Sequence, residues 1–355
     1  MTDRDDSRTM QSAVREAWEQ TTPLRLTGSG SKDFYGRQTQ AERVLELASH
    51  RGIVDYQPTE LVITARAGTP LAEIEETLHA QGQMLPFEPP YFGGHGTLGG
   101  AIASGLSGPR RPWGGSPRDL LLGVKILDGR GRILNFGGQV MKNVAGYDIS
   151  RLMAGALGTL GILLEVSVKV LPRPAEETTI RFNRPAEAFQ TLLTRMLNED
   201  MPITATYRYA DDCGLRLGCG QQRVKQILSR YGITPEASLA ESFWSDLRDH
   251  KHAFFNHDAP LWRVAVPPTA RVDFSQPMLC EWAGGQRWMF SQSPADEIRE
   301  HVSRLGGHAT QFRGGDRTGQ VFHPLHPRIA DLQTGLKRVF DPRGILNPGR
   351  LYAED

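Results

Sequence analysis

The chain has 355 residues, of which 39% are hydrophobic and 23% charged, a composition typical of a globular protein with about two domains. Its 41 basic and 40 acidic residues give a net charge of +1, so it lacks the basic surplus of proteins that bind nucleic acid or anionic membranes. The N-terminus lacks the apolar segment of a signal peptide. The most apolar stretch, 152–166, is too short to cross a bilayer and is interrupted by small and polar residues. We therefore expect a cytoplasmic protein without a membrane span.

The first part of the chain alternates helical and strand patterns. Val44, Leu45 and Ala48 fall at helical spacing, and the run 60–66 alternates like a half-buried strand. Pro70 suits the first turn of a helix. The expected elements are a helix over 10–20, a strand over 24–26, a helix over 42–50, strands over 53–56 and 60–66, and a helix from residue 70.

A hairpin is predicted further along, because Asp128-Gly129-Arg130-Gly131 is a turn sequence between two apolar runs. Pro172-Arg173-Pro174 closes a later strand and marks a domain boundary. Between these limits we expect a helix over 98–104, strands over 120–127 and 132–135, a helix through Leu152 and a strand over 162–171.

The second domain follows a β–α–β–β–α pattern of ferredoxin-like type. Its expected elements are a strand over 178–182, a helix over 186–197, strands over 203–209 and 214–218, and a helix over 223–231. Cys213 and Cys219 stand an even number of residues apart near one strand, so we expect both to face the core. With Cys280 the chain has three cysteines, too few for the four ligands of an iron–sulfur cluster.

Three glycine-rich turns carry the strongest functional signal. They are Thr27-Gly28-Ser29-Gly30-Ser31 and the runs 93–100 and 155–161. Glycine lets backbone amides approach a phosphate without a Cβ and permits positive φ, so successive N–H groups can form an anion-binding concavity. The helix over 98–104 is expected to point free amides at the second turn. Close packing alone could explain the glycines of any single turn but explains three such turns poorly, so together the turns predict a pyrophosphate site.

The second turn also matches the GxGxxG spacing of dinucleotide-binding folds through Gly94, Gly96 and Gly99, with Asp119 at about the distance of a ribose ligand. That motif must follow a buried strand. The preceding segment, 85–90, instead holds three prolines, which cannot donate to a sheet ladder. We therefore reject an NAD site.

These turns resemble those of the FAD-binding domain in the vanillyl-alcohol oxidase and p-cresol methylhydroxylase (PCMH-type) superfamily. The resemblance covers about 20–174 and returns at 340–349 (FDPRGILNPG), which resembles a C-terminal signature of D-lactate and glycolate dehydrogenases. The segments 104–114 (SGLSGPRRPWG) and 140–148 (VMKNVAGYD) are most similar to the smaller FAD-binding subunits of bacterial glycolate oxidases.

The resemblance implies an α+β fold. It places a PCMH-type FAD-binding domain of two α/β subdomains over 1–174, a smaller ferredoxin-like α+β cap domain over 175–326, and over 327–355 a C-terminal segment that returns to the FAD domain. It also implies which residues hold the cofactor, mostly through backbone amides, which explains why small residues dominate. The implied FAD-binding residues are Thr27, Gly28, Ser29, Gly30, Ser31, Lys32, Pro86, Thr97, Leu98, Gly99, Gly100, Ala103, Ser104, Gly105, Ser116, Asp119, Gly158, Thr159, Gly161 and Ile162.

The resemblance also bears on how FAD is held. Relatives that tether FAD place a histidine just after the first glycine turn, but Ser31 and Lys32 occupy that position here. The histidine to consider is His95, which lies in the second glycine turn. It stands too close to the expected pyrophosphate to reach the isoalloxazine ring. We therefore expect non-covalent FAD. The residues leave open whether His95 touches phosphate or is an exposed side chain.

The cap departs from the catalytic members of the family, which carry a His-x-Gly-Asp-Gly-Asn-x-His segment that binds metal and hydroxy acid. Gly314-Gly315-Asp316 lacks the flanking histidines, and His323 and His326 lie in a proline-rich loop without a carboxylate partner in sequence. Zinc and iron sites need three or four ligands. We therefore expect no metal and assign no catalytic residue.

Three functions remain open. The first is the FAD-binding subunit of a glycolate oxidase (glycolate dehydrogenase) complex that converts the small 2-hydroxy acid glycolate to glyoxylate. There it would have an accessory or electron-transferring role beside a larger catalytic flavin subunit and an iron–sulfur subunit. The complex would lie in the cytoplasm or be attached peripherally to the inner membrane.

The second is a stand-alone FAD-dependent D-2-hydroxy-acid dehydrogenase for D-lactate or glycolate, with Arg313, Arg317 and His323 as candidates for carboxylate binding and proton transfer. The third is a non-catalytic assembly scaffold, which three intact glycine turns disfavour.

Overall fold

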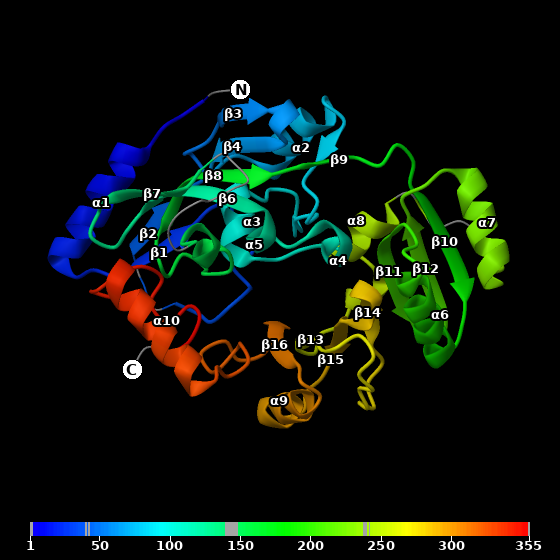
Figure 1. Cartoon of the computed structure of the whole chain (residues 1–355). Helices are drawn as coiled ribbons and strands as arrows, with labels where there is room; N and C mark the ends of the chain where they lie inside the picture. Colours follow the sequence, from blue (N-terminus) through cyan, green and yellow to red (C-terminus); the bar gives the residue numbers. More distant parts are fainter. Residues whose placement is uncertain are drawn as a thin grey trace. The chain divides into compact units, whose positions relative to one another are not determined.

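The structure is a computed structural model that describes residues 3–39, 41, 43–138, 148–236, 240 and 242–353. It divides into two compact units (Figure 1). The first unit comprises 1–107, 115–172 and 316–355, and the second comprises 108–114 and 173–315. The chain therefore leaves the first unit twice and returns to it twice.

The unit boundaries differ from the expected domains at two places. Residues 316–326, expected in the cap, belong to the first unit, where the Arg317 guanidinium donates to the Gly36 carbonyl at 2.8 Å. Residues 108–114, expected in the FAD domain, belong to the second unit, where Arg110 donates to both carboxylate oxygens of Glu177 at 2.8 and 2.6 Å. Composition and proline positions could not reveal either crossing, because both depend on contacts between residues far apart in the chain.

A five-stranded antiparallel sheet forms the centre of the first unit, in the order β3-β4-β8-β6-β7. Two strands, β1 and β2, pair in parallel beside it, and β5 pairs with β9. The first unit contains α1 (Ser7–Gln20), β1 (Leu24–Thr27), β2 (Arg43–Glu46), β3 (Ile53–Gln57), β4 (Val62–Arg66), α2 (Leu71–His79), β5 (Gln83–Met84), α3 (Leu98–Ser104), α5 (Pro117–Leu120), β6 (Leu121–Leu127), β7 (Ile133–Gly137), β8 (Ile162–Lys169), β9 (Leu171–Pro172), α10 (Pro327–Phe340) and short 3-10 helices at Pro58–Glu60 and Ser150–Met153.

Two hydrophobic clusters hold this unit together. In one, Leu78 of α2 and Ile102 of α3 pack with Val166 of β8. In the other, Val14 of α1 packs with residues of β1, β8 and the C-terminal segment, among them Leu346. These five side chains are fully buried, and burying each contributes roughly 1.5–3 kcal/mol. The clusters place α3, β1 and the C-terminal segment around one position, where the glycine turns meet.

The predicted helix over 42–50 is wrong. Residues Arg43–Glu46 form strand β2, in parallel register with β1, and residues 47–50 form no helix. Leu45 faces the cluster around α1, whereas Val44 on the opposite side is exposed. The apolar spacing fits either element, and pairing with β1 decided between them.

Two further expectations concern the segment after β7. The helix expected to end at Leu152 is a 3-10 helix of a single turn, Ser150–Met153. The segment 140–148, one of the two most similar to glycolate oxidase subunits, lies outside the described residues except for Asp148.

A seven-stranded sheet, in which every pair is antiparallel, forms the second unit. Its order is β10-β12-β11-β14-β15-β13-β16. The second unit contains α4 (Arg111–Gly114), β10 (Thr178–Asn183), α6 (Ala186–Asn198), β11 (Ile203–Tyr209), β12 (Asp212–Leu217), α7 (Gln221–Tyr231), α8 (Phe243–Arg248), β13 (Leu261–Ala265), β14 (Leu279–Glu281), β15 (Gln286–Phe290), α9 (Ala295–Arg304), β16 (His308–Arg313) and short 3-10 helices at Ala253–Phe255 and Trp282–Gly284.

The predicted β–α–β–β–α pattern agrees with β10, α6, β11, β12 and α7, which pair in the ferredoxin-like order β10-β12-β11. The later strands repeat that order as β14-β15-β13-β16, without the first helix. The two halves join where β11 pairs with β14. As expected, Cys213 is buried and Cys219 packs against the same cluster.

Candidate functional site

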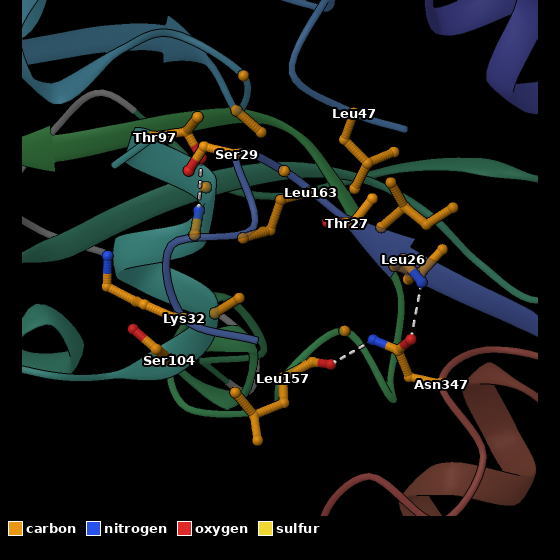
Figure 2. A pocket seen from close by; sticks show the side chains of 18 of the residues that line it. Leu26, Thr27, Ser29, Lys32, Leu47, Thr97, Ser104, Leu157, Leu163 and Asn347 are labelled. Carbon is orange, nitrogen blue, oxygen red and sulfur yellow. Dashed lines mark hydrogen bonds between the residues drawn. The ribbon is translucent and has the colours of Figure 1, made fainter. Parts of the chain in front are cut away.

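A cleft opens in the first unit where the first and third glycine turns meet α3 (Figure 2). It holds about 900 Å³ of empty space, part of it open to solvent. The predicted cofactor residues that line it are Thr27, Gly28, Ser29, Gly30, Ser31, Lys32, Thr97, Gly99, Gly100, Ala103, Ser104, Gly158, Gly161 and Ile162. The structure therefore brings fourteen of the predicted residues together.

The first glycine turn supplies the free amides of the cleft. Within the described part of the chain, the N–H groups of Gly28, Ser29, Gly30 and Ser31 donate to no protein acceptor. Gly30 has a φ of +75°, and a Cβ on Gly28 would lie 3.1 Å from the Thr97 hydroxyl oxygen. Successive unpaired N–H groups on such a turn form an anion-binding concavity.

The second glycine turn does not offer the free amides that its sequence predicts. Thr97 caps α3, and its hydroxyl accepts from the Gly100 N–H at 3.1 Å. The Leu98 and Gly99 N–H groups donate to Thr69 O at 2.9 Å and Ala67 O at 2.7 Å. The start of α3 is thus a wall of the cleft whose donors are already used.

Gly99 is required by packing rather than by phosphate approach. A Cβ at this position would lie 2.6 Å from the Ala67 Cβ and 2.8 Å from the Ala67 carbonyl oxygen. Because backbone cannot give way as a flexible side chain can, a larger residue would displace α3 from β4.

The third glycine turn closes the cleft opposite the first. Leu157 N donates to Ala103 O at 2.9 Å, which ties the turn to α3. Gly158 has a φ of +74°, and a Cβ there would lie 2.9 Å from Asn347 Nδ2 and 3.0 Å from Leu26 Cδ1. Glycine is therefore needed at 158 both for its backbone conformation and for space.

Asn347 joins two walls of the cleft and was missed by the sequence analysis. Its Oδ1 accepts from Leu26 N at 2.8 Å, and its Nδ2 donates to Leu157 O at 2.7 Å, as Figure 2 shows. The residue is buried and has a φ of +43°, a conformation that asparagine tolerates better than most residues. The NPG sequence at 347–349 was the available signal, but its contacts lie about 190 and 321 positions away in the chain.

Arg350 brings a positive charge to the edge of the cleft and was also missed. Its guanidinium donates to the backbone oxygens of Arg37 and Asp33, each at 3.1 Å, rather than to a carboxylate of the described chain. Burial, with the nearby charge of Arg317, lowers the pKa of Arg350 to about 10. The group therefore remains charged at neutral pH, and an anionic ligand in the cleft would offset part of its desolvation.

Six of the predicted residues do not line the cleft: Pro86, Leu98, Gly105, Ser116, Asp119 and Thr159. Several have roles in the fold. Ser116 and Asp119 form the capping box of α5, Gly105 ends α3 in a left-handed conformation, and the Thr159 hydroxyl donates to Ala156 O at 2.8 Å. His95 is exposed and also lies outside the lining.

The candidate residues for substrate chemistry lie outside the cleft lining, and the two arginines donate to backbone carbonyls. Arg313 lies in the second unit and donates to Phe255 O at 3.4 Å, while Arg317 donates to Asp33 O at 2.6 Å. The His323 carbonyl accepts from the Tyr352 hydroxyl at 3.3 Å. These residues do not line the cleft. Over the described ranges, no three His, Cys, Asp or Glu side chains are grouped as a metal site would need.

No helix in the described part of the chain has both the length and the apolar character needed to cross a membrane.

A family model of the FAD binding domain matches residues 5–137. The chain is 42% identical over 351 residues to glycolate oxidase subunit GlcE of Escherichia coli (strain K12), covering 99% of this chain and 98% of that protein. It is 31% identical over 409 residues to glycolate oxidase subunit GlcD of Bacillus subtilis (strain 168), covering 95% of this chain and 85% of that protein.

A solved structure shows the same fold. The crystal structure of p-cresol methylhydroxylase with substrate bound matches with a TM-score of 0.73, covering 97% of this chain and 87% of that chain. The sequences are 13% identical, so this likeness concerns the fold alone.

Proposed function

The chain belongs to the PCMH-type FAD-binding family, as an FAD-binding subunit of the glycolate oxidase type, and we propose that it works beside a larger catalytic flavin subunit rather than alone. The observation that carries the assignment is the 42% identity to a glycolate oxidase subunit over nearly the full length of both chains. The reaction of the complex is then the oxidation of glycolate to glyoxylate.

The cleft fits the anionic part of FAD. The unpaired amides of 28–31 would hold the pyrophosphate, and the Arg350 charge would add long-range attraction. The third turn would contribute backbone through Gly158 and Gly161, which line the cleft. When bound, FAD supplies the two-electron chemistry that side chains lack. The residues of this chain bind it and orient it.

We propose that FAD is bound non-covalently. Ser31 and Lys32 line the cleft where tethering relatives have a histidine, and His95 is exposed and outside the lining. Acid denaturation should therefore release all flavin into the supernatant after the protein is pelleted. Flavin that remains on the polypeptide in a denaturing gel would contradict this proposal.

An accessory or electron-transferring role is supported by how the candidate catalytic groups are used. Arg313 and Arg317 donate to backbone carbonyls, and no metal-ligand cluster occurs over the described ranges. Substrate oxidation is then carried out mainly by the larger flavin subunit, and an iron–sulfur subunit accepts the electrons. Any attachment to the inner membrane would come through the complex.

The test compares this chain alone with the chain co-expressed with both presumed partner subunits. Flavin content and glycolate-dependent dye reduction are measured in each preparation. We expect the isolated chain to contain FAD but to reduce little dye with glycolate or D-lactate, and the complex to be active. Full activity of the isolated chain would contradict the accessory role and favour a stand-alone dehydrogenase.

A second experiment tests the division of labour within the complex. Arg313, His323 and His326 are replaced singly by alanine, and turnover is measured together with assembly and flavin content. We expect turnover to change little. A large fall in turnover with intact assembly and normal flavin would place substrate chemistry in this chain.

A further inference from the structure

The last helix of the first unit, α10, exposes an apolar stripe. Among the described residues, six large apolar side chains are exposed, and the three most exposed lie on α10: Ile329 (50%), Leu332 (65%) and Val339 (60%). They are three and seven positions apart, so they share one face of the helix. We call these three residues the α10 stripe. Scattered single exposures are common on protein surfaces, but three aligned on one helix are not.

Other residues of α10 anchor the helix to the first unit, so the stripe has a defined place on the surface; Figure 1 locates the helix. Phe340 is buried and contacts Phe136 edge-on, with ring centroids 6.1 Å apart. Lys337 Nζ donates to the Asp341 carboxylate at 2.7 Å and to the backbone oxygens of Leu346 and Thr159 at 2.9 and 3.0 Å. The helix spans about 21 Å at 1.5 Å per residue, long enough to form the centre of a subunit interface.

The surroundings of the α10 stripe are basic. Arg328 and Arg338 are exposed on the helix itself, against one acidic residue, Asp331. Arg130 donates to Val339 O at 3.2 Å, and Arg343 is exposed just beyond the helix. Two copies of this surface would bring like charges together, which is unfavourable in an interface. A partner with an acidic rim would satisfy them.

We propose that the α10 stripe is the centre of the contact surface for a different subunit of the same enzyme, whose matching surface is apolar at its centre and acidic at its rim. The inference rests on the proposed function, under which this chain is one subunit of a complex. An apolar centre with a charged rim is the usual anatomy of a specific interface, and most of its binding energy comes from a few central residues. Leu332, the most exposed of the three, is the best candidate for such a residue.

The experiment uses the full chain co-expressed with the presumed larger flavin and iron–sulfur subunits, the larger flavin subunit carrying an affinity tag. The amount of this chain recovered with the tag is measured for the wild type and for Leu332→Glu, Arg338→Glu and Val54→Glu. Val54→Glu is the matched control, because Val54 is an exposed apolar residue of the same unit, on strand β3. Flavin content and melting temperature of each isolated variant report folding.

We expect Leu332→Glu to reduce recovery by about tenfold or more, equivalent to about 1.4 kcal/mol. Arg338→Glu should reduce recovery less than Leu332→Glu does. Its effect should be larger at low salt, because attraction between charges at the rim of an interface is screened by salt. Val54→Glu should be recovered like the wild type. All variants should retain wild-type flavin content, since the substituted side chains are exposed.

Two outcomes would overturn the inference. One is wild-type recovery of Leu332→Glu. The other is that the isolated wild-type chain forms a homodimer and that Leu332→Glu makes it dissociate, which would show that a second copy covers the stripe. Failure of the wild-type chain itself to join the complex would remove the proposed function, and this inference with it.

Discussion

Replacing Asn347 should open the FAD cleft without unfolding the unit. Its amide is the direct link between β1, which leads into the first glycine turn, and the third glycine turn. Asn347→Ala leaves the Leu26 N–H and the Leu157 carbonyl without their partner. It also places alanine at a φ of +43°, where a Cβ is unfavourable.

The size of the effect follows from these contacts. A buried donor or acceptor left unsatisfied costs about 1–3 kcal/mol, and both groups here are partly buried, so the total is on the order of 3 kcal/mol. If FAD binding must restore the order of the two walls, that cost is subtracted from the binding free energy. At about 1.4 kcal/mol per tenfold change, FAD should bind up to about 100-fold more weakly.

The assay is titration of the FAD-free protein by flavin fluorescence, with near-ultraviolet circular dichroism as the check on folding. Asn347→Gly separates the two causes, because glycine relieves the strain at positive φ but cannot make either hydrogen bond. We expect Asn347→Gly to bind FAD nearly as weakly as Asn347→Ala. Wild-type affinity of Asn347→Gly would show instead that the two hydrogen bonds do not hold the cleft walls together.

Arg350→Met should weaken FAD binding about tenfold and flatten its salt dependence. Arg317→Met removes a similar bond to Asp33 O from a residue outside the lining and should change affinity little; equal losses in titration would mean that both arginines are only structural. Gly158→Val should abolish FAD binding, because its Cβ would lie within 3.0 Å of two side chains that join the cleft walls; normal flavin content after purification would contradict this. Burial lowers the pKa of His50, so the unfolded chain takes up the proton first and stability should fall as pH drops below about 6.5; melting temperatures that stay constant between pH 7 and 5 would show that this burial does not contribute.

Short-range patterns predicted much of the fold correctly. Turn residues and apolar alternation located β6 and β7 around their hairpin, and the β–α–β–β–α run located β10 to α7 close to their observed bounds. The segment 42–50 was predicted wrongly because Val44, Leu45 and Ala48 fit two periodicities. Its pairing with β1 is a tertiary contact that no local pattern contains.

The glycine turns could be recognised from the sequence as suited to a phosphate ligand, and resemblance to a known family identified that ligand as FAD. The turns could be recognised because glycine at positions such as 30 and 158 has a positive φ, a backbone conformation that other residues rarely adopt. Which backbone amides are available to the ligand depends on tertiary contacts. The donors at the start of α3 are taken by Ala67 and Thr69, whereas those of 28–31 are not. Asn347 and Arg350 joined the site for the same reason, since hydrogen bonding and charge depend on distance in space and not on distance along the chain.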